Sequence, residues 1–66
     1  MLELDLILLH YVENYFSQLS VQQQYNFEQL LSCTDPELEN WLLRNQASEP
    51  LFHGIVKDIR YKLKLP

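Results

Sequence analysis

The sequence predicts an all-α protein, a small antiparallel bundle of four to five helices in a single helical domain over residues 1–66. Apolar residues recur every three or four positions in successive segments, which is the spacing of amphipathic helices. Residues typical of helix starts precede several of these segments, and no two segments are joined by a hairpin turn. A chain of 66 residues has enough apolar surface for one core only.

The first segment, MLELDLILLHYV, places six Leu and Ile residues within nine positions. Its longest unbroken apolar run, LILL at residues 6–9, is far shorter than the ~20 residues of a membrane-spanning helix. No Lys or Arg precedes Arg44, which argues against a secretory signal. The alternation of leucines with Glu3 and Asp5 favours a strand at first, but it ends at Ile7.

Helical spacing continues further along this segment and predicts a helix over about residues 6–18. Its apolar stripe consists of Leu4, Leu8, Val12, Tyr15 and Leu19. If this helix began earlier and continued through Asp5, the carboxylate of Asp5 would lie on the apolar face. Burial of that charge is costly unless the charge is paired. We therefore expect Asp5 to be the N-cap and residues 1–4 to form a separate lead-in. Glu3 then projects from the lead-in, where a partner can contact it.

Start signals place the next two helices. Ser20 and Gln23 form the S-x-x-Q pattern of a capping box and predict a helix over residues 21–32. Asp35 as N-cap, with Pro36 at the first helical position, predicts a third helix that ends near Arg44. The residues expected to be buried in these helices are Phe27, Leu30, Leu31, Leu38, Trp41 and Leu42.

The segment NQASEP is the clearest loop of the chain. Ser48 is expected to cap the last helix, over residues 51–64, with Pro50 in its first turn. Gly54 costs a helix about 1 kcal/mol relative to Ala, so we expect it to mark a close helix crossing. The buried face of this helix is expected to contain Phe52, Ile55, Val56, Ile59 and Leu63.

The formal net charge is −4, with a pI near 4.9. Eight of the nine acids lie within residues 1–49, and four of the five bases (Lys57, Arg60, Lys62 and Lys64) lie in the last ten residues. Cations at a helix C-terminus favour the helix dipole, which is the simplest interpretation of this basic end. An acidic chain lacks the overall basic charge typical of nucleic-acid binders.

No arrangement of residues indicates catalysis. His10 and His53 have no partner at metal-ligand spacing, Cys33 has no neighbouring His, and one glycine is too few for a phosphate-binding loop. Cys33 is the sole cysteine, so we expect a buried or half-buried thiol in a reducing compartment such as the cytosol. From its residues, the chain is a helical domain that acts by binding, not an enzyme.

Three stretches carry a resemblance to a known family: MLELDLILLHYVENYFSQLS, FEQLLSCTDPELENWL and IVKDIR. Together they resemble the small FAD assembly factors of succinate dehydrogenase, called SdhE or YgfY in bacteria and the second succinate dehydrogenase assembly factor in mitochondria. The resemblance covers almost the whole chain and implies a bundle of about five helices. It also implies a chaperone-like protein. We further expect a cytoplasmic protein that is a monomer or weak dimer.

The implied partner is the flavoprotein subunit of succinate dehydrogenase, and of related fumarate reductases, where the family promotes covalent attachment of FAD to a histidine. The FAD then belongs to the client, and no cofactor is bound stably by the factor itself. The alternative is an antitoxin-like regulatory module that acts on a membrane-anchored partner. A small DNA-binding protein is a third reading, which the acidic charge opposes.

The family motif is Arg-Gly-x-x-Glu, and Glu3 matches its Glu. The Arg and Gly would precede Met1, so we expect either an earlier start or a shortened or diverged member. The family usually has a Gly where this chain reads Arg44-Asn45-Gln46. The expected partner-binding residues are Glu3 and Asp5, with Leu9 and Tyr11 extending the contact from the edges of the first helix.

Overall fold

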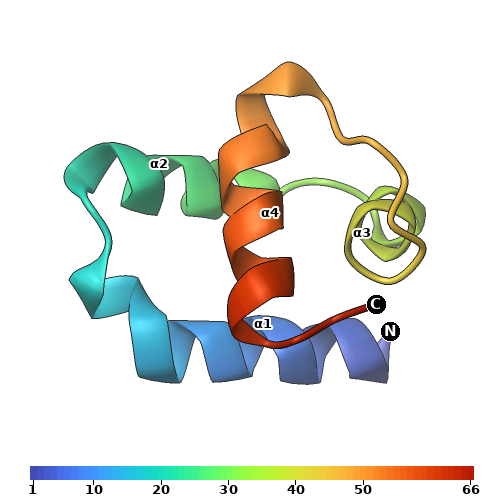
Figure 1. The fold of residues 1–66 in the computed structure, drawn as a ribbon, viewed down its shortest axis with the longest axis horizontal. Coiled ribbons are helices and arrows are strands. Elements are labelled where there is room, and N and C mark those ends of the chain that lie inside the picture. Colours follow the sequence, from blue (N-terminus) through green and yellow to red (C-terminus); the bar gives the residue numbers. More distant parts are fainter.

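The computed structural model describes residues 1–66 and contains helices only, which confirms the all-α bundle. The four α-helices are α1 (Leu2–Tyr15), α2 (Val21–Leu30), α3 (Asp35–Leu42) and α4 (His53–Lys62). Two short 3₁₀ helices, η1 (Phe16–Gln18) and η2 (Pro50–Phe52), lead into the neighbouring segments. In Figure 1, α1 and α2 run in opposite directions, α4 crosses in front of them, and α3 is seen end-on.

The core lies where α4 faces the other three helices. Eleven apolar residues are buried there: Leu4, Tyr11, Phe27, Leu30, Leu38, Trp41, Leu42, Phe52, Ile55, Val56 and Ile59. Aromatic rings join the elements, because Phe27 of α2 packs against Tyr11 of α1 at 5.4 Å and Trp41 against Phe52 at 5.7 Å between ring centroids. Of the residues expected in the core, Leu31 is 49 % and Val12 41 % exposed, and Leu63 is only partly buried.

The prediction for the start of α1 is wrong. This helix begins at Leu2, and the amide of Asp5 donates to the carbonyl oxygen of Met1 at 3.1 Å, as inside a helix. Residues 1–4 therefore form no separate lead-in. Asp5 is exposed because the buried face centres on Leu4 and Tyr11, and each residue turns the helix by about 100°. The buried face of α1 is thus rotated away from Asp5, so its carboxylate stays in solvent without acting as a cap.

The capping box of α2 is confirmed, because Ser20 and Gln23 exchange hydrogen bonds between side chains and backbone. For α3 the cap lies one residue earlier than predicted. Thr34 is the N-cap and forms a capping box with Glu37, so Asp35 is the first helical residue. The Thr34 hydroxyl accepts a hydrogen bond from the amide of Glu37, and the Glu37 carboxylate accepts one from the amide of Thr34. With Asp35 as the cap, this reciprocal pair would not form.

Helix α3 stops before Arg44, and the chain reverses at Asn45. This residue has a φ of 55°, in the left-handed region that usually favours glycine. The amide of Gln46 reaches back to the carbonyl oxygen of Asn40 at 2.9 Å and closes the end of the helix. Asn is among the non-glycine residues that best tolerate this conformation, so the turn forms here without a glycine.

Ser48 does not cap the last helix, as the sequence led us to expect. It is buried, and its carbonyl oxygen accepts a hydrogen bond from Nε2 of His53 at 2.6 Å. The turn η2 comes between Ser48 and α4, and Pro50 begins it. The crossing expected at Gly54 is also absent, since a Cβ added there would meet no atom within 4 Å.

Candidate partner-binding surface on helix α1

Helix α1 has one face in the core and another in solvent, and both are apolar. Leu4 and Tyr11 are fully buried, while Ile7, Leu8 and Tyr15 are partly buried against the core. On the other side Leu2 is 73 %, Leu6 57 % and Leu9 54 % exposed. These three positions are spaced by four and three residues, so they form one continuous stripe. We call Leu2, Leu6 and Leu9, with Glu3 and Asp5, the α1 outer face.

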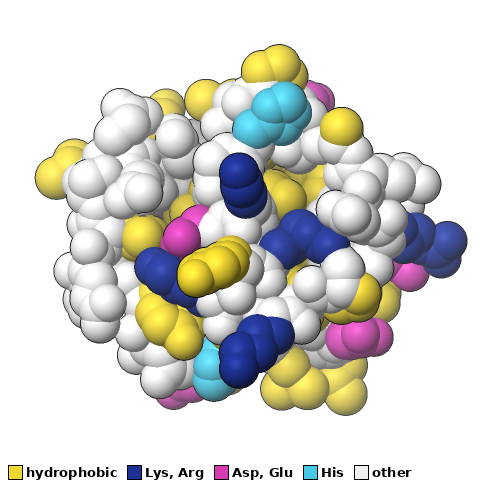
Figure 2. Space-filling view, viewed as in Figure 1, with side chains coloured by type: hydrophobic (Ala, Val, Ile, Leu, Met, Phe, Trp, Pro, Cys, Tyr) yellow, Lys and Arg dark blue, Asp and Glu magenta, His cyan; other side chains and the backbone are white.

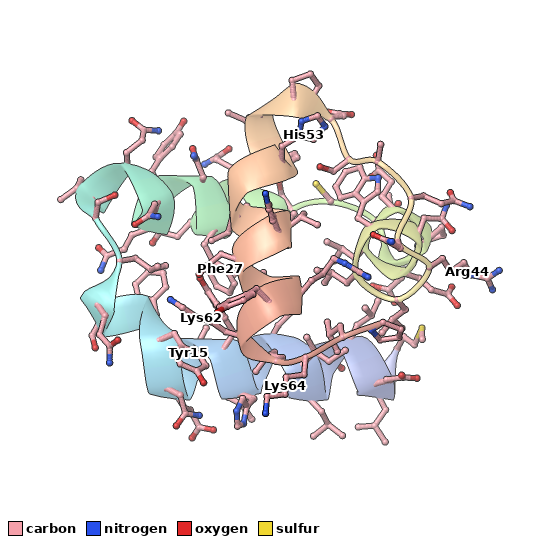
Figure 3. All side chains as sticks on the ribbon, in the orientation of Figure 1. Tyr15, Phe27, Arg44, His53, Lys62 and Lys64 are labelled. Carbon is pink, nitrogen blue, oxygen red and sulfur yellow. The ribbon has the colours of Figure 1, made fainter.

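Figure 3 shows side chains of α1 that extend away from the bundle, on the side opposite α4. Val12, at 41 % exposure, and Met1, at 44 %, add to the apolar surface at its margin. Scattered exposed leucines are ordinary, but a stripe along a helix at regular spacing is typical of an interaction site.

Acidic groups occupy one end of the α1 outer face. Glu3 and Asp5 are both exposed, and neither side chain forms a hydrogen bond or an ion pair within the chain. Their position in the first turn of α1 places negative charge where the helix dipole is positive, which stabilises the helix. Both carboxylates keep their full capacity to accept hydrogen bonds from a partner.

Tyr11 does not extend this surface, which corrects the expectation from the sequence. It is completely buried, and its hydroxyl donates to Oδ2 of Asp58 on α4 at 2.5 Å. Asp58 also pairs with Nζ of Lys62 at 3.1 Å, and that ammonium lies 5.1 Å from the centre of the Tyr15 ring. Figure 3 shows Lys62 reaching from α4 toward Tyr15. Tyr11 thus fixes α1 against α4, on the face opposite the exposed leucines.

Burial, together with the hydrogen bond to Asp58 and its negative charge, raises the pKa of Tyr11 above its ordinary value. Burial, with the charges of Glu37 and Glu49, likewise raises the pKa of Cys33. A thiol with a raised pKa is a poor nucleophile at neutral pH, so Cys33 is a half-buried structural residue, as expected.

The sequence interpretation placed Glu3, Asp5 and Leu9 at the surface but missed Leu2 and Leu6. A signal was present, because residues 2, 6 and 9 repeat the spacing of residues 4, 8 and 11 on the opposite side of the helix. Two apolar stripes on one helix exceed what a single core can cover.

Elsewhere, no group of three or more His, Cys, Asp and Glu side chains is placed to hold a metal ion. No helix is long and apolar enough to span a bilayer.

A family model described as the flavinator of succinate dehydrogenase matches residues 1–62. The chain belongs to this family. The match includes all of α1 and therefore the whole of the α1 outer face. It confirms the resemblance drawn from the sequence motifs.

Curated relatives agree with this family. A protein of Vibrio vulnificus (strain YJ016) named FAD assembly factor SdhE is 41 % identical over 58 residues, which are 88 % of this chain and 67 % of the relative. A protein of the same name from Pasteurella multocida is 36 % identical over 66 residues, covering 98 % of this chain and 79 % of the relative. One from Haemophilus ducreyi is 34 % identical over 65 residues, 97 % of this chain and 79 % of that relative. No solved structure matches.

Proposed function

We propose that this protein binds the flavoprotein subunit of succinate dehydrogenase, and of related fumarate reductases, and promotes covalent attachment of FAD to that subunit. Membership of the flavinator family supports the activity. The observation that carries the proposal is the α1 outer face, where three leucines lie in solvent beside two unpaired carboxylates. In this proposal the protein is not an enzyme, and FAD resides on the client.

The two kinds of group on the α1 outer face have different tasks. Leu2, Leu6 and Leu9 supply apolar area that leaves water when a client covers it, at about 25 cal/mol per Å². Glu3 and Asp5 accept hydrogen bonds from a basic or N–H-rich patch of the client, which sets the orientation of the complex. The rigid helix holds both sets at fixed spacing, so little conformational entropy is lost on binding.

The mechanism is a shift of the client's conformational populations. The flavin and its host protein can carry out the coupling chemistry themselves, provided that the acceptor histidine and the flavin ring meet. A factor that binds this conformation more tightly than the others shifts the equilibrium toward it. At saturation, the shift equals the ratio of the factor's affinities for this conformation and for the others. The α1 outer face needs to contribute binding energy only, and no side chain of this protein takes part in the bond-forming step.

The test is co-expression with the flavoprotein subunit and measurement of covalent flavin by its fluorescence on the denatured subunit. In Leu6→Glu a charge replaces the middle leucine of the stripe, and we expect covalent flavin to fall at least about fivefold, as for the loss of an interface hot spot. Val21→Glu is the matched control, since Val21 is 84 % exposed on α2, outside the α1 outer face. Both variants should keep the circular dichroism of the parent.

A second variant tests the acidic end. Glu3→Ala should lower covalent flavin by a smaller factor, with unchanged helix content, because one exposed carboxylate contributes about 1 kcal/mol or less. If Leu6→Glu and Val21→Glu give the same yield of covalent flavin, the α1 outer face is not the binding surface.

A further inference from the structure

A hollow with a volume of about 620 Å³ lies between helix α4 and the loop that follows α3. Its lining contains cationic, amide and apolar side chains and no carboxylate: Trp41, Asn45, Gln46, Ala47, Ser48, His53, Val56, Lys57 and Arg60. We call it the α4 hollow. Figure 2 shows this side of the molecule, where the Lys and Arg side chains gather over α4. In a chain with a net charge of −4, such a concentration of positive charge is a local feature.

The two cations of the α4 hollow have no acidic partner. The ion pairs within the chain use Arg44, Lys62 and the amino group of Met1 instead. Lys57 is exposed and makes no hydrogen bond. Arg60 donates from Nη1 to the carbonyl oxygens of Leu42, at 2.5 Å, and Trp41, at 3.4 Å, which leaves its other guanidinium nitrogens free. No carboxylate lies within ion-pair distance of either side chain.

The walls of the α4 hollow are held in place by contacts within the fold. Trp41 is only 7 % exposed and packs on Phe52. The ring of His53 is tied to the backbone of Ser48, and the backbone carbonyls at the end of α3 fix the guanidinium of Arg60. Of the two cations, Arg60 is therefore positioned before any ligand arrives, which reduces the entropy cost of binding.

We propose that the α4 hollow binds an acidic segment of a partner protein, with carboxylates on Lys57 and Arg60 and an apolar side chain against Trp41 and Val56. A single small anion gains little here, because each ion pair at an exposed site contributes only about 0–1 kcal/mol. A polypeptide combines several such contacts and adds apolar contact with the floor, so it can reach useful affinity. A nucleic acid usually needs several phosphate contacts, and the α4 hollow offers only Lys57 and Arg60 as cations.

This inference does not depend on the proposed function, because the α4 hollow and the α1 outer face share no residue. The chain also supplies a reporter specific to the site. Trp41 is the sole tryptophan and lines the α4 hollow, so its fluorescence reports occupancy there.

The probe is a synthetic peptide of alternating Glu and Leu, titrated into the full chain while Trp41 fluorescence is followed. We expect a saturable change that weakens as salt is added, since screening acts on the ion pairs. A peptide with Gln in place of each Glu is the matched control and should bind roughly threefold to thirtyfold more weakly, as expected for the loss of two ion pairs of up to about 1 kcal/mol each.

Variants then locate the site. Lys57→Gln should weaken the Glu peptide by roughly threefold to tenfold, as for one lost ion pair in a partly shielded hollow. Arg44→Gln makes the same change of charge at a cation that is already paired with Glu39 and lies outside the hollow, so it should leave the affinity unchanged. Lys57 is exposed, and circular dichroism should show that its variant remains folded.

Equal effects of Lys57→Gln and Arg44→Gln would overturn the proposal, since they would indicate general charge attraction. The same holds if the Gln peptide binds as tightly as the Glu peptide. It also fails if inorganic phosphate or a short single-stranded DNA changes Trp41 fluorescence at lower concentration than the Glu peptide does.

Discussion

Helices α1 and α4 pack against each other, yet they use their apolar residues differently. On α4 the buried residues Ile55, Val56 and Ile59 lie on one face. Apart from Gly54 and the exposed Tyr61, the other residues of this helix are polar or charged. On α1 the leucines are divided between the core and the solvent. Helix α4 therefore has the composition that folding requires, whereas α1 has an apolar excess that folding does not explain. This excess is the strongest sign of function in the molecule.

The two outer faces also differ in charge. The α1 outer face is apolar and acidic, and α1 contains no Lys or Arg. The outer side of α4 is basic, with Lys57 and Arg60 free of acidic partners. One small chain thus offers two surfaces of opposite chemistry, which suit partners of opposite charge.

The largest expected effect tests the division of leucines on α1. Leu4→Ala should lower the free energy of unfolding by about 2–5 kcal/mol, because it leaves a cavity in the core. A domain of this size has a net stability of roughly 3–5 kcal/mol, so much of the variant will be unfolded. Leu6→Ala is the same substitution on the exposed side and should change stability by less than about 0.5 kcal/mol. Urea denaturation followed by circular dichroism measures both.

Similar losses in the two variants would break the comparison, because Leu6 would then contribute to the core. A small loss of stability in Leu4→Ala would also break the comparison, because Leu4 would then contribute little to the core.

A middle-sized effect concerns the link between the two helices. Tyr11→Phe removes the hydroxyl that donates to Asp58 and should cost about 1–2 kcal/mol at neutral pH. The parent should also lose stability in alkali. The pKa of Tyr11 is raised in the folded chain, so its contribution is complete below the unfolded value of 10.0 and declines as pH rises above it.

Unfolding free energies of the parent and of Tyr11→Phe, measured from pH 8 to about 11, should therefore converge as the pH rises above the unfolded pKa. A constant difference between the two curves would mean that Tyr11 ionises normally in the folded chain.

The smallest expected effect is at Gly54, on the exposed side of α4. A Cβ there meets no atom within 4 Å, and the φ angle is not positive. Gly54→Ala should raise the free energy of unfolding by about 0.5 kcal/mol, since alanine is the better helix former. Thermal denaturation measures this gain in stability. Unchanged binding of the Glu peptide would confirm that Gly54 does not belong to the α4 hollow. A loss of stability would indicate a contact that the fold does not show.

The sequence was informative where a pattern is local. The capping box at Ser20 and Gln23 and the buried positions of α3 and α4 depend on residues a few positions apart, and they were predicted correctly. The cap of α3 was misplaced by one residue because Thr34 and Asp35 can both cap, and the choice depends on Glu37 reaching back to the N-cap amide. Gly54 was given a packing role that only the position of neighbouring helices could decide.

The candidate site was predicted in part, for a related reason. Exposed Glu3 and Leu9 followed from the pattern, but which side of α1 faces the core depends on α4, which lies far along the chain. Tyr11 looked like an edge residue until Asp58, forty-seven positions away, gave its hydroxyl a partner. The same rotation of the helix moved Asp5 out of the core and left Leu2 and Leu6 in solvent.

The leucine stripe on α1 has a consequence for the free protein. Any molecule that covers Leu2, Leu6 and Leu9 excludes another from the same area, whether it is the proposed client or a second copy of this chain. Self-association through this stripe would therefore compete with the proposed client. In that case dilution of the protein would raise the fraction of molecules able to bind.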